Sequence, residues 1–256
     1  MGIVTTGVAR RPRAYVRVQG PDAEDFLQRL LSNDVAAAPC EALLLTAKAR
    51  VIAPLLVSRR GPDDFLLLTE PDLGDVVLRH LRRFRFAARC EIEPEEHTSA
   101  IVFGGTGGIP NEEYGLPAVE VLDDGLEPTL SAEELELLRI RAGTPRFGRE
   151  LDDRVLPAEA GLDERAISFT KGCYPGQEPV ARLHFRGRAN RRLRRLEIEA
   201  DEPPAYDAEV RHEGKVVGRV TSAARDGDHV AALGYVRVEV PEDAELEVSG
   251  RRTRLH

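Results

Sequence analysis

Hydrophobic residues follow a helical repeat in two segments near the start of the chain and gather in short runs between them. In the first segment four apolar side chains share one face, which predicts a helix over 22–31. They are Phe26, Leu27, Leu30 and Leu31. A second predicted helix begins near Asp72 and carries several arginines on its polar side. Apolar runs bounded by turn residues predict strands over 14–18, 42–46, 51–58, 65–69, 91–93 and 100–103.

The remainder of the chain contains one helix signal and then a long β-rich stretch. Ser131 followed by Glu134 is a capping-box pattern, and the helix that it predicts ends near Gly143. From about Leu193 onward the apolar runs are short and separated by turn residues, which predicts a small closed barrel or a sandwich. Its strands are expected over 196–200, 209–212, 216–221, 230–240 and 246–248.

Composition narrows the class of protein. The 256 residues suffice for one large domain or two to three small ones, and the net charge of −8 argues against a generic nucleic-acid binder, so that any anionic partner must be held by a local patch. We expect neither a signal peptide nor a membrane span, because no apolar run approaches about 18–20 residues. Cysteine and histidine spacing predicts no metal site, and we expect a cytoplasmic protein with reduced thiols.

The most informative segment runs from Lys171 to Glu178 and places Cys173 in a turn between Gly172 and Gly176. Nearby positive charge favours a thiolate, so this setting predicts a reactive thiol. The alternative is that Cys173 is an ordinary buried small residue, an interpretation that we keep for the other two cysteines.

A dense run of arginines follows this segment. A carboxylate tail, a phosphate or an RNA backbone would suit it, because arginine pairs with such anions through two hydrogen bonds. The alternative is a solvated loop and strand edge neutralised by surface acids. The run comprises Arg182, Arg186, Arg188, Arg191, Arg192, Arg194 and Arg195. The glycine loop at 104–108 lacks the spacing of a phosphate-binding loop, and we interpret it as a mobile loop.

The segment from Lys171 to Glu178, together with Arg182, Gly187 and the stretch 190–193, resembles the signature of the YgfZ-type folate-binding proteins. These are relatives of the glycine-cleavage T-protein, an aminomethyltransferase. The resemblance covers nearly the whole chain. It includes the segments 26–35, 139–148, 156–162, 217–222 and 233–236.

This resemblance implies an α+β fold with three lobes around a central, folate-sized channel and a small C-terminal β-barrel. The first lobe would be split over 1–36 and 97–185, the inserted second lobe would cover 37–96, and the barrel 186–256. YgfZ-type proteins are implicated in iron–sulfur cluster assembly or repair, and through it in tRNA modification. We therefore expect a monomeric accessory protein that binds tetrahydrofolate and acts on iron–sulfur proteins, without direct contact to nucleic acid or membrane.

The resemblance also implies roles for individual residues. Cys173 would be the functional thiol, with Lys171 and Arg182 favouring its ionised form. Hydrogen bonds from Gln177 and Glu178 would fix the loop, and the arginine run would receive the glutamate tail of the folate or an acidic partner. The expected cofactor-binding residues are Lys171, Tyr174, Gln177, Glu178, Arg182, Arg141 and Asn33.

Two departures from the aminomethyltransferase pattern change the expected activity. Ala53 and Pro54 stand where the transferases carry a catalytic Asp, and neither can take a proton. Arg141 replaces a Glu that anchors the pterin, and a guanidinium only donates hydrogen bonds. We therefore do not expect a competent glycine-cleavage aminomethyltransferase. The alternatives are a one-carbon transferase or demethylase that uses another acid, such as Asp34, and a scaffold that keeps the fold without a ligand.

Overall fold

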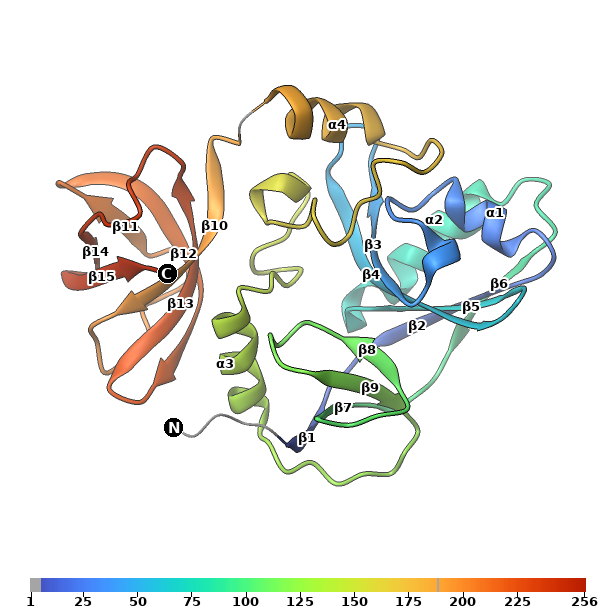
Figure 1. Cartoon of the computed structure of the whole chain (residues 1–256), viewed down its shortest axis with the longest axis horizontal. Helices are drawn as coiled ribbons and strands as arrows, with labels where there is room; N and C mark the ends of the chain where they lie inside the picture. Colours follow the sequence, from blue (N-terminus) through green and yellow to red (C-terminus); the bar gives the residue numbers. More distant parts are fainter. Residues whose placement is uncertain (1–5, 188) are drawn as a thin grey trace.

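Two open sheets and one closed barrel organise the chain in the computed structural model, which describes residues 6–187 and 189–256 (Figure 1). The first sheet is antiparallel, with five strands in the order β3-β4-β5-β2-β6. These strands are β2 (Ala14–Gln19), β3 (Cys40–Leu45), β4 (Val51–Gly61), β5 (Asp64–Thr69) and β6 (Glu91–Glu95). Each of them was expected from the apolar runs, with small differences at the ends.

Both faces of this sheet are buried, which explains the uninterrupted apolar run at 65–68. Successive side chains on a strand point to opposite faces. Alternate residues of β5 therefore belong to two cores, one of them beneath helices α1 (Ala23–Gln28) and α2 (Gly74–Phe84).

Helix α1 is shorter than the helix predicted over 22–31, because it ends at Gln28. Leu31 instead forms an isolated bridge with Leu44 of β3, so the chain leaves the helix to join the sheet. Short 3₁₀ helices lie in the connections, as η1 (Val35–Ala37), η2 (Pro71–Leu73) and η3 (Pro157–Glu159).

The second sheet is also antiparallel and has the order β1-β7-β9-β8. Helix α3 (Ala132–Ala142) packs on it. The predicted capping box is confirmed, since Ser131 and Glu134 bond reciprocally, and Gly143 ends the helix with a left-handed φ of 76°. The strands are β1 (Gly7–Arg10), β7 (Ser99–Phe103), β8 (Ile109–Asn111) and β9 (Ala118–Leu122), of which the apolar pattern predicts only β7.

The C-terminal segment forms the predicted barrel, closed in the order β10-β13-β12-β11-β14-β15. Figure 1 shows it beside α3, apart from the two sheets. Helix α4 (Gln177–Arg186), which the sequence does not predict, precedes it. The barrel strands are β10 (Arg191–Ile198), β11 (Glu209–His212), β12 (Lys215–Asp226), β13 (His229–Arg237), β14 (Leu246–Val248) and β15 (Arg251–Leu255).

The division into sheets differs from the expected lobe boundaries at one strand. Strand β2 pairs with β5 and β6, so the segment 1–36 contributes a strand to the sheet of the 37–96 segment. The boundaries themselves stay a prediction. None of the helices in the described part of the chain combines the length and the apolar character needed to cross a membrane.

Candidate ligand cavity

A cavity of about 250 Å³ lies where the two sheets meet the loops that follow α3, and we call it the central cavity. Segments far apart in the sequence line it. Its apolar wall comes from Pro39, Leu43, Pro54, Leu55, Leu56, Leu151 and Leu162. Its charged residues are Arg11, Arg13, Glu41, Glu70, Glu112, Glu113, Arg139, Arg146 and Arg165. Each of these arginines pairs with a carboxylate, so the wall combines apolar surface with fixed ion pairs.

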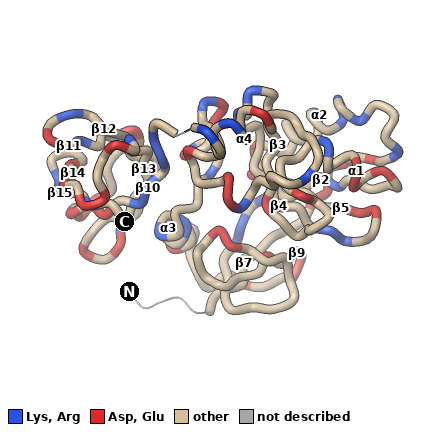
Figure 2. Tube along the Cα trace, turned by 45° about the horizontal axis from the view of Figure 1, so that its top comes forward, with Lys and Arg blue, Asp and Glu red and all other residues tan. Residues whose placement is uncertain are grey.

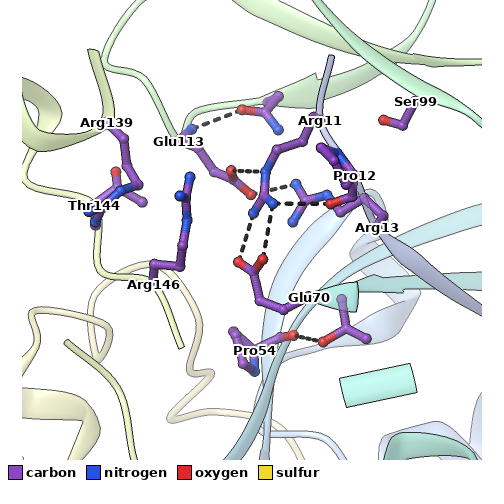
Figure 3. Close-up of polar contacts among 12 residues, drawn as sticks. Arg11, Pro12, Arg13, Pro54, Glu70, Ser99, Glu113, Arg139, Thr144 and Arg146 are labelled. Carbon is purple, nitrogen blue, oxygen red and sulfur yellow. Dashed lines mark hydrogen bonds and ion pairs between the residues drawn. The ribbon is translucent and has the colours of Figure 1, made fainter. Parts of the chain in front are cut away.

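A buried network of ion pairs holds one side of the cavity (Figure 3). Arg11 donates to both carboxylate oxygens of Glu70, at 2.7 and 3.0 Å, and its Nε donates to Glu113 at 3.2 Å. Nη2 of Arg13 donates to Glu113 at 2.5 Å and to Glu120 at 2.8 Å. Burial alone would raise the pKa of Glu113, but Arg13 and Arg11 outweigh it and hold that pKa well below its usual range. The Glu113 carboxylate is therefore charged, and Glu70, Glu113 and Glu120 are all engaged by protein groups.

Two polar atoms on the opposite side are buried and have no hydrogen-bond partner among the described residues: Oγ1 of Thr144 and Nε of Arg146. Thr144 is 4% exposed, and its carbonyl accepts a bond from Nη1 of Arg139 at 2.5 Å. Nη1 of Arg146 pairs with Glu136 at 2.8 Å, which fixes the guanidinium while Nε stays available. In Figure 3 the Arg146 side chain lies between Thr144 and the Arg11–Glu70 pair. A buried donor without a partner costs stability, so both atoms are suited to a ligand.

The signature segment lies outside the lining of the central cavity. The ammonium of Lys171 donates to the carbonyls of Leu31 and Asn33, both at 2.8 Å, and lies 5.6 Å from the ring of Tyr174. Burial lowers the pKa of Lys171 to about 8, against the opposing effect of Asp34 and a thiol. That thiol belongs to Cys40. The two hydrogen bonds direct the ammonium of Lys171 toward the Leu31–Asn33 turn.

Cys40, rather than Cys173, is the cysteine that lines the central cavity. It is half-buried, and burial together with Asp34 raises the pKa of its thiol to about 11. Cys173 is exposed and Cys90 is buried, and the role of Cys173 as a functional thiol stays a prediction. The thiol that faces the cavity is therefore protonated at neutral pH, and the exposed thiol lies elsewhere.

Asn33 supports the cavity wall from behind. Its Nδ2 donates to the carbonyls of Glu41 and Arg165, at 2.7 and 3.1 Å. Glu41 and Arg165 both line the cavity and form an ion pair of 2.8 Å with each other. Asn33 therefore positions a charged pair of the wall without reaching the cavity itself.

The other predicted site residues lie on α4 and α3, except Tyr174, which precedes α4. Gln177, Glu178 and Arg182 belong to α4, where Glu178 and Arg182 are exposed. Tyr174 is buried, and its hydroxyl has no hydrogen-bond partner among the described residues. The guanidinium of Arg141 pairs with Asp226 of the barrel, with Nε donating at 2.6 Å, and so it links α3 to β12.

The arginine run divides between paired and free side chains. Arg191 pairs with Glu159 at 3.1 Å and Arg194 with Glu242 at 3.3 Å. These two side chains therefore fit the alternative in which surface acids neutralise the arginines. Arg182 and Arg192 have no carboxylate partner within the described part of the chain. Arg188 lies outside the described residues.

The position of the transferase acid lies on the cavity wall. Ala53 is fully buried in the sheet core, while Pro54 lines the cavity and its carbonyl accepts a bond from Thr69 at 2.8 Å. Asp34 caps η1 by accepting from the amide of Ala36 at 3.0 Å and does not line the cavity. The described lining therefore holds no carboxylate from this strand or from Asp34.

No protein-family model matches the chain. A tRNA-modifying protein YgfZ of Serratia proteamaculans is 27% identical over 286 residues, covering 93% of this chain and 84% of that protein. A mitochondrial iron–sulfur cluster assembly factor homolog of Pyricularia oryzae is 23% identical over 93% of this chain and 73% of its own length. The crystal structure of the glycine cleavage system aminomethyltransferase T of Bartonella henselae superposes with a TM-score of 0.84, at 19% identity, over 98% of this chain and 85% of that one.

The chain is a YgfZ-type protein with the fold of the glycine-cleavage T-protein. Both the suggested family and the fold class, including the closed C-terminal barrel, are therefore confirmed. The residues of this YgfZ-type protein that motif reasoning missed are those of the cavity wall. Thr144 and Arg146 lie inside a segment that resembles the family, at 139–148, and this is the one signal that could have found them. Arg11, Glu70 and Glu113 carry no local signal.

Proposed function

We propose that this YgfZ-type protein binds tetrahydrofolate in the central cavity and serves as an accessory factor in iron–sulfur cluster assembly or repair, through which it supports tRNA modification. The observation that carries the proposal is the pair of buried, unpartnered atoms of Thr144 and Arg146 on the wall of a cavity whose other lining is largely apolar or ion-paired. The relatives named for tRNA modification and for iron–sulfur cluster assembly support the cellular role.

The cavity residues fit one part of the cofactor well. A pterin ring is flat and carries both donors and acceptors, and leucine and proline walls with Thr144 and Arg146 at one side suit such a ring. The cavity volume of about 250 Å³ lies below the range of about 300–1,000 Å³ for drug-sized ligands. The ring would therefore be enclosed and the glutamate tail would extend outside.

The chemistry expected of the protein is binding rather than aminomethyl transfer. A bound tetrahydrofolate supplies a carrier for one-carbon units. Of the groups in the chain, the apolar wall would exclude water, and Thr144 and Arg146 would orient the ligand. Glu70 and Glu113 are engaged by Arg11, and so neither is free to act as a base.

The exposed Cys173 is proposed to contact a partner iron–sulfur protein at the surface. It lies just before α4, whose arginines Arg182 and Arg186 are exposed beside it in the sequence. Labelling with iodoacetamide at pH 7.4, followed by mass spectrometry, should modify Cys173 first and Cys40 slowly. Equal labelling rates for Cys173 and Cys40 would contradict this role.

Thermal unfolding with tetrahydrofolate tests the cofactor proposal directly. At a free concentration of 100 times Kd, a ligand stabilises the native state by about 2.7 kcal/mol. For a chain of this size, that corresponds to a rise in Tm of about 5–10 °C. Thr144→Val and Arg146→Met should reduce the rise, whereas Arg225→Met on the barrel should leave it unchanged. No rise in the wild type, or an equal rise in all variants, would refute the assignment of the cavity.

A further inference from the structure

The end of helix α2 carries an exposed stretch in which arginine and phenylalanine alternate, with the sequence Arg82-Arg83-Phe84-Arg85-Phe86. All five residues are exposed, and Phe84 and Phe86 have 37% and 86% of their surface accessible. We call this stretch the α2 patch. Figure 2 shows blue segments near the α2 label, at the edge of the molecule. Neither the cavity nor the signature segment includes any of these residues.

The arginines of the α2 patch have no compensating acid. None of Arg82, Arg83 and Arg85 has a carboxylate within 4.0 Å in the described ranges, and neither has Arg79 one turn earlier. Nε of Arg82 donates to the carbonyl of Ile92 at 3.0 Å, which holds the side chain on the surface without neutralising it. In a protein with a net charge of −8, such a concentration of uncompensated positive charge is a local binding site for an anion.

The two phenylalanine rings of the α2 patch cluster with the ring of His80 beside these charges. His80 and Phe84 have ring centroids 4.9 Å apart, and Phe86 meets Phe84 edge-on at 6.5 Å. The guanidinium of Arg83 lies 5.9 Å from the Phe84 ring. Phe86 has a φ of 42°, in the left-handed region that bulky side chains rarely adopt. A strained backbone that presents a solvent-exposed ring is typical of a binding site.

We infer that the α2 patch binds single-stranded RNA, with phosphates on Arg82, Arg83 and Arg85 and an unpaired base stacked on Phe86. Exposed rings among arginines are the combination that recognises single strands, because every base offers a face for stacking and every nucleotide a charge. This inference goes beyond the proposed function and does not depend on folate binding. It also replaces the expectation that the protein makes no direct contact with nucleic acid.

A membrane is the less suitable partner for this surface. The apolar face of α2, with Val77 and Leu81, is fully buried in the protein core. Only Phe84 and Phe86 remain to enter a lipid layer, whereas helices that lie in a membrane surface use a continuous apolar face. Duplex nucleic acid is less suitable too, because its bases are already stacked.

Fluorescence anisotropy with a labelled oligouridine single strand tests the inference. Phe86→Leu keeps an apolar side chain but removes the ring, and it should weaken binding between about 5-fold and about 140-fold, the range for loss of one stacked base. Phe86→Trp should retain binding. Changing Arg82, Arg83 and Arg85 together to Gln should make the plot of log affinity against log salt shallower by about 2, since each phosphate contact on a single strand contributes about 0.7.

The matched control removes the same charge from the barrel, by changing Arg225, Arg251 and Arg252 to Gln. These side chains are exposed as well. The control should retain wild-type affinity and salt dependence, and an unchanged Tm should show that each variant is folded. Equal loss in both triple variants, equal affinity for a duplex of the same length, or competition by polyglutamate as effective as by RNA would overturn the inference. Binding to vesicles with phosphatidylserine but not to the oligonucleotide would also overturn it.

Discussion

The two glycines of the signature segment should respond very differently to substitution by alanine, although the sequence presents them alike. Gly176 has a φ of 85°, and a Cβ there would stand 2.6 Å from the carbonyl oxygen of Thr46 and 3.1 Å from Cα of Ala49. Gly172 has an ordinary backbone conformation, and nothing lies within 4 Å of a Cβ added to it. Gly176 is therefore required where the segment packs on the β3–β4 turn, and Gly172 is not.

The expected magnitudes follow from these two geometries. For Gly176→Ala, the left-handed conformation costs about 1–2 kcal/mol and the contact with backbone atoms a further ~1–3 kcal/mol. A total near 3 kcal/mol corresponds to a fall in Tm of roughly 6–12 °C for a chain of this length. Gly172→Ala should change the stability by less than about 0.5 kcal/mol, as an exposed surface substitution does.

Thermal and urea unfolding followed by circular dichroism would measure both variants side by side. Iodoacetamide labelling of Cys173 in the same samples reports whether the turn itself has moved. The sheet region and the barrel need not unfold together. The relevant Tm is therefore that of the transition in which the buried Cys90, which shares a core with β3 and β4, becomes labelled. Equal losses of stability for Gly176→Ala and Gly172→Ala would refute the close packing of Gly176 on the β3–β4 turn.

Three further outcomes can be measured on the same protein. Arg13→Met removes the charged partner of the fully buried Glu120, which keeps only its hydrogen bonds from Ser99 and Asn111, so urea unfolding should show a loss of about 3–5 kcal/mol, and a loss below 1 kcal/mol would contradict it. Burial alone would lower the pKa of His97, but hydrogen bonds with Asp123 and Glu95 raise it. The protonated His97 therefore stabilises the fold fully below about pH 6.5, and this stabilisation is lost as the pH rises through the raised pKa. The difference in unfolding free energy between wild type and His97→Gln should shrink over that range, and a constant difference would refute the assignment. Phe86→Gly should raise Tm by relieving the left-handed conformation, and a lower Tm would argue against strain there.

The parts of the fold that sequence reasoning predicts have strong local signals. Helix α3 has its capping box at Ser131 and Glu134, and the barrel has regularly spaced turns between short strands. Helix α4 has no such signal, because Val180 is the one residue of it that is buried and its arginines are exposed. A helix that buries so little of one face has no apolar repeat to find. Strand β8 spans three residues and contains Pro110, which weakens a strand pattern further.

The cavity network could not be predicted because its members meet only through strand register. Ala14 of β2 pairs with Thr69 of β5, and this places Arg11 and Arg13 near Glu70, far away in the sequence. Glu113 arrives from the other sheet, on the loop after β8. A shift of one residue in the β2–β5 register would turn the side chains of β2 to the opposite face. Which charged residues meet therefore depends on the register, and local sequence patterns do not give the register.

The signature segment and the central cavity are joined by a single turn, which explains how a motif remote from the cavity can still shape it. Lys171 donates to the carbonyls of Leu31 and Asn33, and so holds the turn from one side. From the other side, Ser32 accepts the amide of Leu43 at 2.8 Å and donates to the carbonyl of Ala166 at 2.6 Å, and both of these residues line the cavity. Because the hydroxyl of Ser32 is fully buried, its two bonds cannot be replaced by water. Any displacement of the signature lysine must therefore move the backbone that holds the cavity wall.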